Sequence, residues 1–416
     1  MVTDVLSNED VIIVGAGIGG LVLALELHAN GVPCRLFEAA PEIKPLGMGI
    51  NIQPYATEVL ADLGLLEALE AHAVVTGEFL FYNRHGQEIH RAPAGRAGGH
   101  VFPQLSIHRG DLHAVLLDAV RERIGSDRVS TGSRCVGVGQ LDDRAWATFA
   151  QGAEVSTVEG AAVVGCDGIH SVVYRELFPD GPALRYSGTN MWRGTSVAPD
   201  FLSGASMVRA GLPAEGKIVI YPIRRDIDGH GNNLVNWVVE IDTPLTDPTG
   251  VTTVGSTADF AERFADWRFD WLDIPDLLSR SVGTVLEVPM MDRDPLDHWS
   301  SGPITLLGDA AHPMVPLGSN GGGQAILDAR SLAASLAGET SVEQALRRYE
   351  EERRPSTTSI VLGDRRGVVD LMVREVDRRT QGRPFERLSD VISSEELAVL
   401  AVPNYRDADA ERSLYA

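Results

Sequence analysis

The sequence contains few cysteines and no cluster of metal-ligating residues. Its three cysteines, Cys34, Cys135 and Cys166, are far apart and form neither a CxxC pair nor a Cys/His group. A disulfide framework and a zinc site are therefore poorly supported, and no metal is expected. Cys34 and Cys166 lie in apolar runs typical of strands, where a free cysteine is usually a buried small hydrophobic residue. This use of cysteine fits a reducing cytoplasm.

Basic residues are also scarce. The chain carries 36 Lys and Arg against 58 Asp and Glu, which gives a formal net charge of −22. A surface this acidic repels nucleic-acid phosphates and anionic lipids, so we expect neither nucleic acid nor a membrane as a partner. It does not exclude an anionic substrate, because a few arginines can reverse the field inside a pocket.

No hydrophobic run predicts a membrane span. The most apolar stretch, residues 11–27, is interrupted by four glycines and by Glu26. Acidic residues precede it (Asp4, Glu9 and Asp10), where a signal peptide would have basic ones. The stretch is therefore expected to belong to a soluble domain.

Three short apolar runs have the composition of strands that are buried on both faces of a parallel sheet. They are residues 11–14, 161–166 and 304–307. The first is followed by a predicted helix at 18–29 and a strand at 34–38, which completes a β-α-β unit. Further helices are predicted at 54–72, 110–123, 324–337 and 341–354, with a more polar helical tail from Pro355 onward.

Residues 78–101 and 184–285 instead contain alternating strands and turns rich in Gly, Asn and Asp, which predict a mostly antiparallel sheet. A chain of 416 residues is too long for one small core. We therefore expect an α/β fold in which a Rossmann-like domain is interleaved with a β-sheet substrate domain and followed by C-terminal helices. The Rossmann-like domain is expected at 1–77, 102–183 and 286–355, the substrate domain at 78–101 and 184–285, and the helical extension at 356–416.

The motif Gly15-Ala-Gly17-Ile-Gly-Gly20 lies between the first predicted strand and the first predicted helix, which is the context that a dinucleotide-binding loop needs. Gly15 permits a tight turn, Gly17 lets a pyrophosphate approach the backbone, and Gly20 lets the helix pack closely on the strand. The helix N-terminus offers N–H groups to phosphates. Glu38, at the end of the next strand, can accept hydrogen bonds from ribose hydroxyls. The motif alone does not distinguish NAD from FAD.

A second signature follows the strand at 304–307. Gly308-Asp309 ends this strand, and the glycine-rich stretch 318–323 leads into the next helix. A carboxylate in this position can bond the hydroxyls of a ribityl or ribose chain. The glycine backbone can offer N–H groups to an anionic flavin edge. The two signatures together favour FAD.

Five blocks of the sequence resemble those of the FAD-dependent aromatic hydroxylases of the para-hydroxybenzoate hydroxylase type, the class A flavoprotein monooxygenases. The blocks are 15–38, 47–54, 106–112, 164–171 and 308–313, and the similarity spans about residues 10–355. Within that family, shorter segments are similar to the phenazine-1-carboxylate hydroxylases. These segments are 191–194, 221–223, 235–238, 292–296 and 318–321.

The resemblance implies FAD as the cofactor and assigns its contacts. The fingerprint glycines would hold the pyrophosphate, Arg109 would reach the phosphate or ribityl region, and Asp309 would bond the ribityl chain. Asp167 would border the groove that FAD shares with NAD(P)H. The residues implied to bind the cofactor are Gly15, Gly17, Gly20, Glu38, Gly49, Arg109, Asp167, Asp309, Gly318, Gly321, Gly322 and Gly323. Tyr174 stands where the family usually has arginine, so a charge-based role at this corner is not implied.

The resemblance also implies the reaction. NAD(P)H reduces the FAD, O₂ adds to it, and the resulting C4a-hydroperoxyflavin hydroxylates an aromatic or N-heteroaromatic small molecule. This chemistry requires neither a protein nucleophile nor a metal, and the sequence contains no nucleophile triad or HExxH motif. The enzyme is expected to be a monomer or a homodimer.

Candidate pocket residues lie in the substrate domain and in the loop after Asp309. Candidates for catalysis are Arg193, Tyr221, His312 and Pro313, and candidates for substrate binding are Trp192, Arg193, Tyr221, Trp237 and Pro313. Several have a structural alternative. The tryptophans can fill the core, Arg193 can pair with an acid instead of clamping a substrate carboxylate, and His312 can support the Asp309 turn.

Three other interpretations stay open at this point. An NAD-dependent dehydrogenase would leave the segment 308–323 unexplained. A non-hydroxylating flavoprotein, such as an epoxidase or a reductase, would share the motifs, and a non-catalytic nucleotide-binding protein would not need them intact. The visible spectrum of bound FAD separates the dehydrogenase from the flavoproteins.

Overall fold

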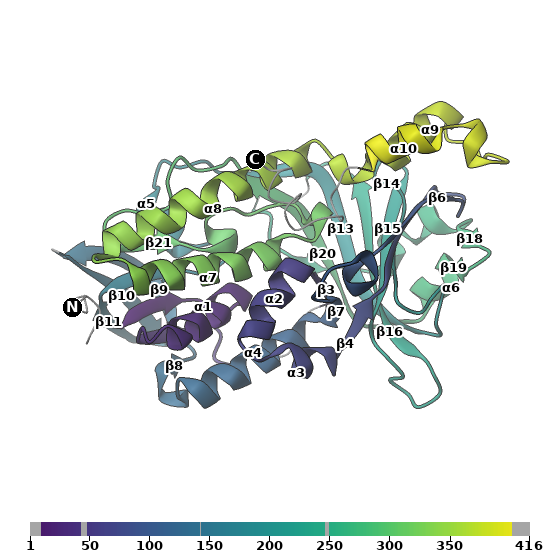
Figure 1. The fold of residues 1–416 in the computed structure, drawn as a ribbon. Helices are drawn as coiled ribbons and strands as arrows, with labels where there is room; N and C mark the ends of the chain where they lie inside the picture. Colours follow the sequence, from purple (N-terminus) through teal and green to yellow (C-terminus); the bar gives the residue numbers. More distant parts are fainter. Residues whose placement is uncertain (1–9, 43–47, 142, 246–248, 402–416) are drawn as a thin grey trace.

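The computed structural model describes residues 10–42, 48–141, 143–245 and 249–401 (Figure 1). Outside these ranges lie Asp4, Glu9 and Gly47, the first residue of the block at 47–54. Within them, no helix has both the length and the apolar character needed to cross a membrane.

A five-stranded parallel sheet forms the first domain, in the order β21-β12-β1-β2-β8. Its central strand, β1 (Val11–Val14), is fully buried, as its continuous apolar run predicts. Helices α1 and α7 lie against each other over this sheet, with α4 beside α1 and α8 beside α7 (Figure 1). The bounds are β2 Cys34–Phe37, β8 Val129–Ser130, β12 Ala162–Gly165, β21 Ile304–Leu306, α1 Ile18–Ala29, α4 Arg109–Arg123, α7 Gly321–Gly338 and α8 Val342–Arg365.

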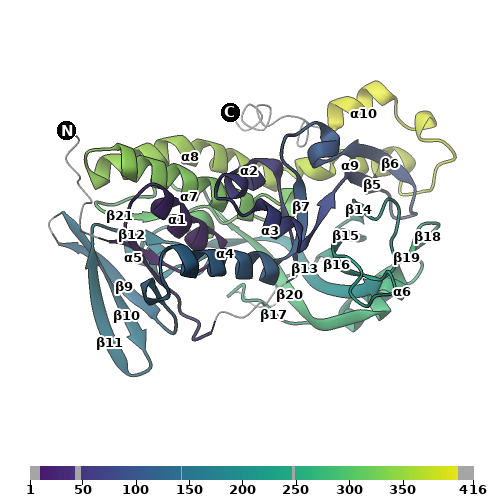
Figure 2. The same ribbon diagram turned by 60° about the horizontal axis from the view of Figure 1, so that its bottom comes forward.

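A three-stranded antiparallel sheet covers the other face of the parallel sheet, on the side away from α8 (Figure 2). Its strands are β9 (Arg134–Leu141), β10 (Arg144–Gln151) and β11 (Glu154–Gly160). Phe149 of β10 stacks on Phe37 of β2, with 4.1 Å between the ring centroids. This layer, which no sequence pattern predicted, buries the second apolar face of the parallel strands.

An eight-stranded sheet forms the second domain, in the order β17-β20-β13-β16-β15-β14-β5-β6. Every pairing is antiparallel except that of β14 with β5, so the expected mostly antiparallel sheet is confirmed. Its bounds are β5 Glu78–Tyr82, β6 Glu88–Pro93, β13 Leu184–Ala198, β14 Ser206–Leu212, β15 Gly216–Arg224, β16 Asn233–Asp242, β17 Thr253–Val254 and β20 Ser281–Arg293. One face packs on a segment that contains β18 Arg268–Phe269, β19 Leu272–Asp273 and α6 Ile274–Ser279.

A small antiparallel sheet, β3-β7-β4, joins the two domains and lies against β15. Its strands are β3 Gly49–Ile52, β4 Ala73–Thr76 and β7 Gln104–His108. Between β3 and β4 the chain forms α2 (Pro54–Asp62) and α3 (Leu66–Glu70) instead of one helix over 54–72. Gly64, with a φ of +70°, separates them, because its backbone lies in the left-handed region that ends helices.

The sequence predicted that the helix starting near residue 341 ends before Pro355. Helix α8 instead runs through Pro355 to Arg365. A proline removes one backbone N–H from a helix, while Thr357, Ile360 and Val361 beyond it are buried and hold the helix in place. The chain then forms α9 (Leu371–Thr380) and α10 (Ser394–Leu400), which pack on the second domain near β6 and β14 (Figures 1 and 2).

Two expected domain boundaries fall inside single elements. Strand β20 crosses residue 285, and α8 crosses residue 355. The residue ranges of the two domains stay predictions, whereas their interleaved order agrees with the observed sheets.

All three cysteines are free thiols. Burial raises the pKa of Cys34 to about 12 and that of Cys135 to about 11, and it also raises the pKa of Cys166. In the part of the chain that the structure describes, no group of His, Cys, Asp and Glu side chains could hold a metal ion.

Candidate active site

The glycine fingerprint forms a tight turn between β1 and α1. Gly15 has a φ of +103°, and a Cβ there would lie 2.5 Å from the carbonyl oxygen of Cys166. A Cβ at Gly20 would lie 2.0 Å from the carbonyl oxygen of Gly15, so neither position accepts a side chain. At Gly17, by contrast, a Cβ would meet no atom within 4 Å, and this residue faces a cavity. The turn therefore presents bare backbone to open space, as a bound pyrophosphate requires.

Glu38, predicted to bond a ribose, lies at the end of β2. Its carboxylate accepts hydrogen bonds from the backbone N–H groups of Ala16 and Ala40, each at 2.8 Å. His113 of α4 lies on the other side of the turn, with Nε2 2.6 Å from the carbonyl oxygen of Ala16. Both side chains hold the fingerprint turn in shape, and the contact of Glu38 with ribose stays a prediction.

One cavity of about 330 Å³ extends from the fingerprint to the large sheet. It is bounded on one side by glycine-rich segments of the first domain and on the other by alternate residues of β13 to β16. The predicted site residues that line it are Gly17, Gly49, Arg109, Arg193, Tyr221, Asp309, Gly321 and Gly322. The structure thus brings together residues from all five sequence blocks or their immediate neighbours.

Gly15, Gly20, Gly318 and Gly323 do not line this cavity but shape its wall. A Cβ at Gly318 would lie 2.4 Å from Asn320 Nδ2, and one at Gly323 would lie 2.7 Å from the hydroxyl of Tyr55. Glycine at these positions lets the loop and the start of α7 pack closely, so that Gly321 and Gly322 reach the cavity.

Arg109 and Asp309 provide the charges at the cofactor side of the cavity. Removal from bulk water lowers the pKa of Arg109, which the nearby Arg193 lowers further, and it raises the pKa of Asp309. Both side chains nevertheless keep surface open to the cavity. FAD contains an anionic pyrophosphate joined to a chain that carries hydroxyl groups. The arginine and the unobstructed glycine backbone suit the pyrophosphate, and the carboxylate suits the hydroxyl groups, so these residues fit FAD.

Asp167 does not line the cavity, although it was predicted near the cofactor groove. Its carboxylate accepts hydrogen bonds from Ser171 Oγ at 2.5 Å and from the backbone N–H of Val172 at 2.6 Å. These bonds hold the start of α5 (Val172–Leu177), which is a common use of Asp at a helix N-terminus. Its neighbours Cys166 and Gly168 line the cavity instead.

Tyr174 of α5, at the position where the resemblance implied an arginine, packs under Arg293 of β20. Arg293 Cζ lies 3.6 Å from the centroid of the Tyr174 ring. The guanidinium also donates to the carbonyl oxygens of Ile169, at 3.1 Å, and Ala310, at 3.4 Å. Arg293 therefore joins the block at 164–171 to the block at 308–313. Sequence reasoning missed this role, although Arg293 lies in the 292–296 segment.

Trp192 and Trp237 do not face the cavity, which corrects their prediction as substrate-binding residues. Both pack around Phe260 on the opposite face of the sheet, with ring centroids 5.6 and 5.8 Å from it. Trp237 is fully buried over Gly194 and donates from Nε1 to Ser196 Oγ at 3.0 Å. The reason is that successive side chains of a strand point to opposite faces. Arg193 and Val238 face the cavity, so Trp192 and Trp237, which precede them, face the other side.

Arg193 and Tyr221 do face the cavity, next to the joint between the domains. Arg193 Nη2 donates to the carbonyl oxygen of Gly49 at 2.7 Å, and the N–H of Gly49 donates to Asn236 Oδ1 at 2.7 Å. Burial raises the pKa of Tyr221, while the positive charge of the nearby Arg193 acts against this rise. The hydroxyl of Tyr221 is therefore protonated at neutral pH.

His312 Nε2 lies 2.6 Å from Asp328 Oδ2, and Arg353 Nε donates to Asp328 Oδ1 at 2.8 Å. Burial favours the neutral acid, but the interactions of Asp328 with His312 and Arg353 prevail and lower the pKa of Asp328. The turn after Asp309 directs His312 inward, where it ties that turn to α7.

Arg209 of β14 and Glu240 of β16 also line the cavity, and sequence reasoning missed both. Arg209 is 3% exposed. Glu240 lies 3.0 Å from Nζ of the fully buried Lys217, which lies 2.9 Å from Asp370. A charged residue within an otherwise apolar strand was the available signal, because such residues are rarely buried without a function or a partner.

The FAD binding domain family matches residues 8–203 and 256–363 of the chain. PhzS of Lysobacter antibioticus, a phenazine 1,6-dicarboxylic acid hydroxylase, is 45% identical over 367 residues, which cover 86% of this chain and 90% of that protein. PtnB3 of Streptomyces platensis, a 3-amino-4-hydroxybenzoate 2-monooxygenase, is 34% identical over 385 residues, which cover 90% of this chain and 87% of that protein. The solved structure of HpxO of Klebsiella pneumoniae with FAD and uric acid has a TM-score of 0.74 at 20% identity, covering 98% of this chain and 95% of that one, and shows the shared fold.

Proposed function

The chain belongs to the FAD-dependent aromatic monooxygenase family, and from this membership we propose that it hydroxylates aromatic carboxylic acids of the phenazine class. The cofactor is FAD, so the NAD-dependent dehydrogenase interpretation no longer applies. NAD(P)H is the reductant typical of the family's monooxygenases, and O₂ supplies the oxygen atom that is transferred.

The relatives support an acid as the substrate. By their names, PhzS acts on a fused-ring dicarboxylic acid and PtnB3 on a benzoate. Both are aromatic carboxylates, and the cavity of this chain contains Arg193 and Arg209. Buried guanidinium groups are the usual partners of a carboxylate, because their paired N–H groups match its two oxygens.

One observation carries the proposal: a single cavity joins the cofactor side to the substrate sheet. Gly17 and Gly19 line its first end, the Gly321-Gly322 backbone its middle, and Arg193 and Tyr221 its far wall. A substrate on the sheet would lie against the cofactor in the same cavity, as transfer of an oxygen atom requires.

The residues proposed to hold FAD follow from this arrangement. The fingerprint backbone would bind the pyrophosphate, Arg109 would neutralise part of its charge, and Asp309 would accept hydrogen bonds from the ribityl chain. The backbone N–H groups at Gly321 and Gly322 would face the flavin ring. When bound, FAD supplies electron transfer from NAD(P)H and activation of O₂.

The side chains of the sheet position the substrate. Tyr221, which stays protonated, can donate a hydrogen bond to a substrate oxygen or ring nitrogen. Met191 and Met207 on the sheet, with Met314 and Leu317 on the opposite loop, form apolar parts of the cavity wall that would keep water away from the reacting ring. Asp167 is proposed to border the NAD(P)H groove through the backbone that it orders.

The proposal is tested with the purified, FAD-loaded enzyme. We expect phenazine-1,6-dicarboxylate or phenazine-1-carboxylate to accelerate the oxidation of NADH or NADPH and to gain one oxygen atom, as mass spectrometry would detect. Benzoate and 4-hydroxybenzoate serve as single-ring comparisons. If no aromatic acid accelerates the oxidation, or if only hydrogen peroxide forms with every acid, the proposed reaction is wrong.

We also propose that the enzyme works in the cytoplasm, as a monomer or a homodimer. Three free thiols without a disulfide support the reducing compartment. Size-exclusion chromatography with light scattering measures the oligomeric state.

A further inference from the structure

Four residues form one row across the substrate sheet. Arg193 of β13 pairs with Val238 of β16, Val238 pairs with Val219 of β15, and Val219 pairs with Arg209 of β14. Directly paired residues point to the same face of a sheet, and all four side chains line the cavity. These four residues form the floor of the cavity: two valines in the middle and an arginine at each end.

The row sets the distance between the two charges. Neighbouring strands lie about 4.8 Å apart, so three strand spacings separate the Cα atoms of Arg193 and Arg209 by roughly 14 Å. Two valines cannot form hydrogen bonds with a ligand and offer a flat apolar surface. A floor of this length matches a fused two- or three-ring aromatic better than a single benzoate ring.

Arg209 has N–H groups that the protein does not use. Its Nε and Nη1 are buried and have no hydrogen-bond partner among the described residues. Its guanidinium lies 5.9 Å from the ring centroid of Phe81, a contact that leaves the N–H groups available. A buried guanidinium without an acceptor is costly, which indicates that a ligand supplies the acceptor.

The nearby acids do not supply it. Glu240 is engaged by Lys217, at 3.0 Å, and Asp370 shares that lysine from the other side, at 2.9 Å. Asp364 has no hydrogen-bond partner for its Oδ2 among the described residues; burial raises its pKa to about 7, and the charge of the nearby Arg209 acts against this rise. In the described part of the chain, no ion pair joins Arg209 to Glu240, Asp370 or Asp364.

Arg193 is placed differently, at the cofactor end of the row. Its Nη2 already donates to the carbonyl oxygen of Gly49, and its Nε is buried without a partner. It can still bind one carboxylate while fixed to β3. Arg209, three strands away, marks the end of the cavity floor that lies farthest from β3.

We propose that Arg209 is a specificity-determining residue that binds the second carboxylate of a fused-ring aromatic diacid, while Arg193 binds the first. The valine pair between them supports the ring system. This inference rests on the proposed function and goes further, because it states which residue makes a diacid a better ligand than a monoacid.

The test compares Arg209→Met and Arg209→Lys with the wild type in the FAD-loaded enzyme. Arg185→Met, a half-exposed arginine of β13, is the matched control. Dissociation constants for phenazine-1,6-dicarboxylate, phenazine-1-carboxylate and unsubstituted phenazine are measured from the change in flavin absorbance. We expect Arg209→Met to weaken binding of the diacid about 10- to 100-fold, the effect of losing a charge-assisted pair of hydrogen bonds.

The monoacid and phenazine should bind Arg209→Met with affinities within about twofold of the wild type. Arg209→Lys should recover part of the diacid affinity, because lysine keeps the positive charge but lacks the paired N–H groups of the guanidinium. The midpoint of urea unfolding should not fall in Arg209→Met, since no protein hydrogen bond from Nε or Nη1 is lost. Equal weakening of all three ligands would show a merely structural role, and an unchanged diacid affinity would overturn the inference.

A failure of the proposed function can be told apart from a failure of this inference. If the wild type hydroxylates none of the phenazines, the same titrations are made with naphthalene-2,6-dicarboxylate and naphthalene-2-carboxylate, which test the two-ended floor without turnover. A preference for the diacid that is lost in Arg209→Met supports the role of Arg209. If neither naphthalene acid perturbs the flavin of the wild type, the inference fails as well.

Discussion

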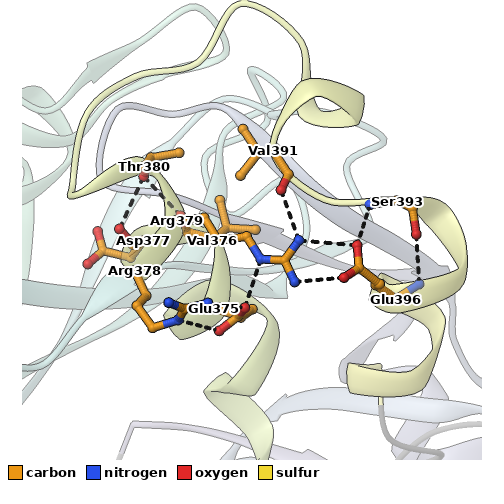
Figure 3. Close-up of polar contacts among 9 residues, drawn as sticks. All are labelled: Glu375, Val376, Asp377, Arg378, Arg379, Thr380, Val391, Ser393 and Glu396. Carbon is orange, nitrogen blue, oxygen red and sulfur yellow. Dashed lines mark hydrogen bonds and ion pairs between the residues drawn. The ribbon is translucent and has the colours of Figure 1, made fainter.

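Two groups of charged side chains, one on the C-terminal helices and one beneath the cavity, show how differently a protein treats charge at its surface and in its interior. On α9 and α10, Arg379 donates to Glu375 at 2.7 Å, to Glu396 at 2.8 Å and to the carbonyl oxygen of Val391 at 3.0 Å (Figure 3). Beneath the cavity, Lys217 lies between Glu240 and Asp370, and all three are at most 5% exposed at the side chain.

The surface group is fully paired, yet water could replace each partner. In the interior group water is excluded, so each charge depends on the partner that the fold provides. Lys217 has two such partners, whereas Arg209, in the same region, has none among the described residues for two of its nitrogens. The contrast teaches that paired charges at a surface say little about function, while an unpaired charge in a cavity wall indicates a ligand. Four experiments test this contrast.

The largest effect is expected from Lys217→Met. The substitution leaves Glu240 and Asp370 buried, close together and without their shared cation, which costs about 3–5 kcal/mol of the free energy of unfolding. Urea unfolding followed by tryptophan fluorescence measures it, with the exposed Arg185→Met as control. A loss below about 1 kcal/mol would mean that the interior group behaves like the surface group.

A change on the opposite face of the sheet should cost stability but not ligand affinity. Trp237→Phe removes the hydrogen bond to Ser196 Oγ and part of the packing on Phe260. We expect a loss of about 1–3 kcal/mol in the free energy of unfolding. The dissociation constant of the aromatic acid should stay unchanged, and a shift of more than a few-fold would indicate that Trp237 takes part in the pocket.

The Asp328 group predicts how stability depends on pH. Because the pKa of Asp328 is lower in the folded protein than its usual value near 3.9, its contribution is complete above about pH 4. That contribution is lost as the pH falls through the folded value, at about 1.4 kcal/mol for each unit of the pKa difference. Urea unfolding between pH 7 and 3 should show a steeper acid loss for the wild type than for Asp328→Asn. Parallel curves would contradict the ion pairing of Asp328.

The smallest effect is expected at the surface group. Arg379→Ala removes the side chain that links α9 to Glu396, but the freed carboxylates become hydrated. The unfolding midpoint and the affinity for aromatic acids should stay within the error of the measurements. A clear loss of stability would show that α10 depends on this link.

Much of the fold could be predicted because its signals are local. The run Val11–Val14 must be buried on both faces, and the glycines after it allow a close turn that has no room for a side chain at Gly15 or Gly20. The sheet β9-β11 was missed, since its outer strand is polar over most of its length and lacks an apolar period. The path of α8 through Pro355 was missed as well, because only tertiary packing decides whether a helix tolerates a proline.

The site was predicted less completely than the fold. Gly17, Arg109 and Asp309 face the cavity as expected, since motifs fix their place at strand ends. Trp192 and Arg193 are adjacent on a strand and could not both face the substrate, a conflict that alternation alone reveals. Arg209 could not be found from any motif, because its importance depends on β14, β15 and β16 being neighbours.

The placement of Asp370 has a consequence for engineering. The matched FAD binding domain ends at residue 363, yet Asp370 helps to hold Lys217 and, through it, Glu240 in the cavity wall. A minimal enzyme trimmed after α8 would therefore lose part of the underside of its own substrate pocket. Exchange of the C-terminal segment between related hydroxylases should succeed only when the incoming segment brings an acid to the same place.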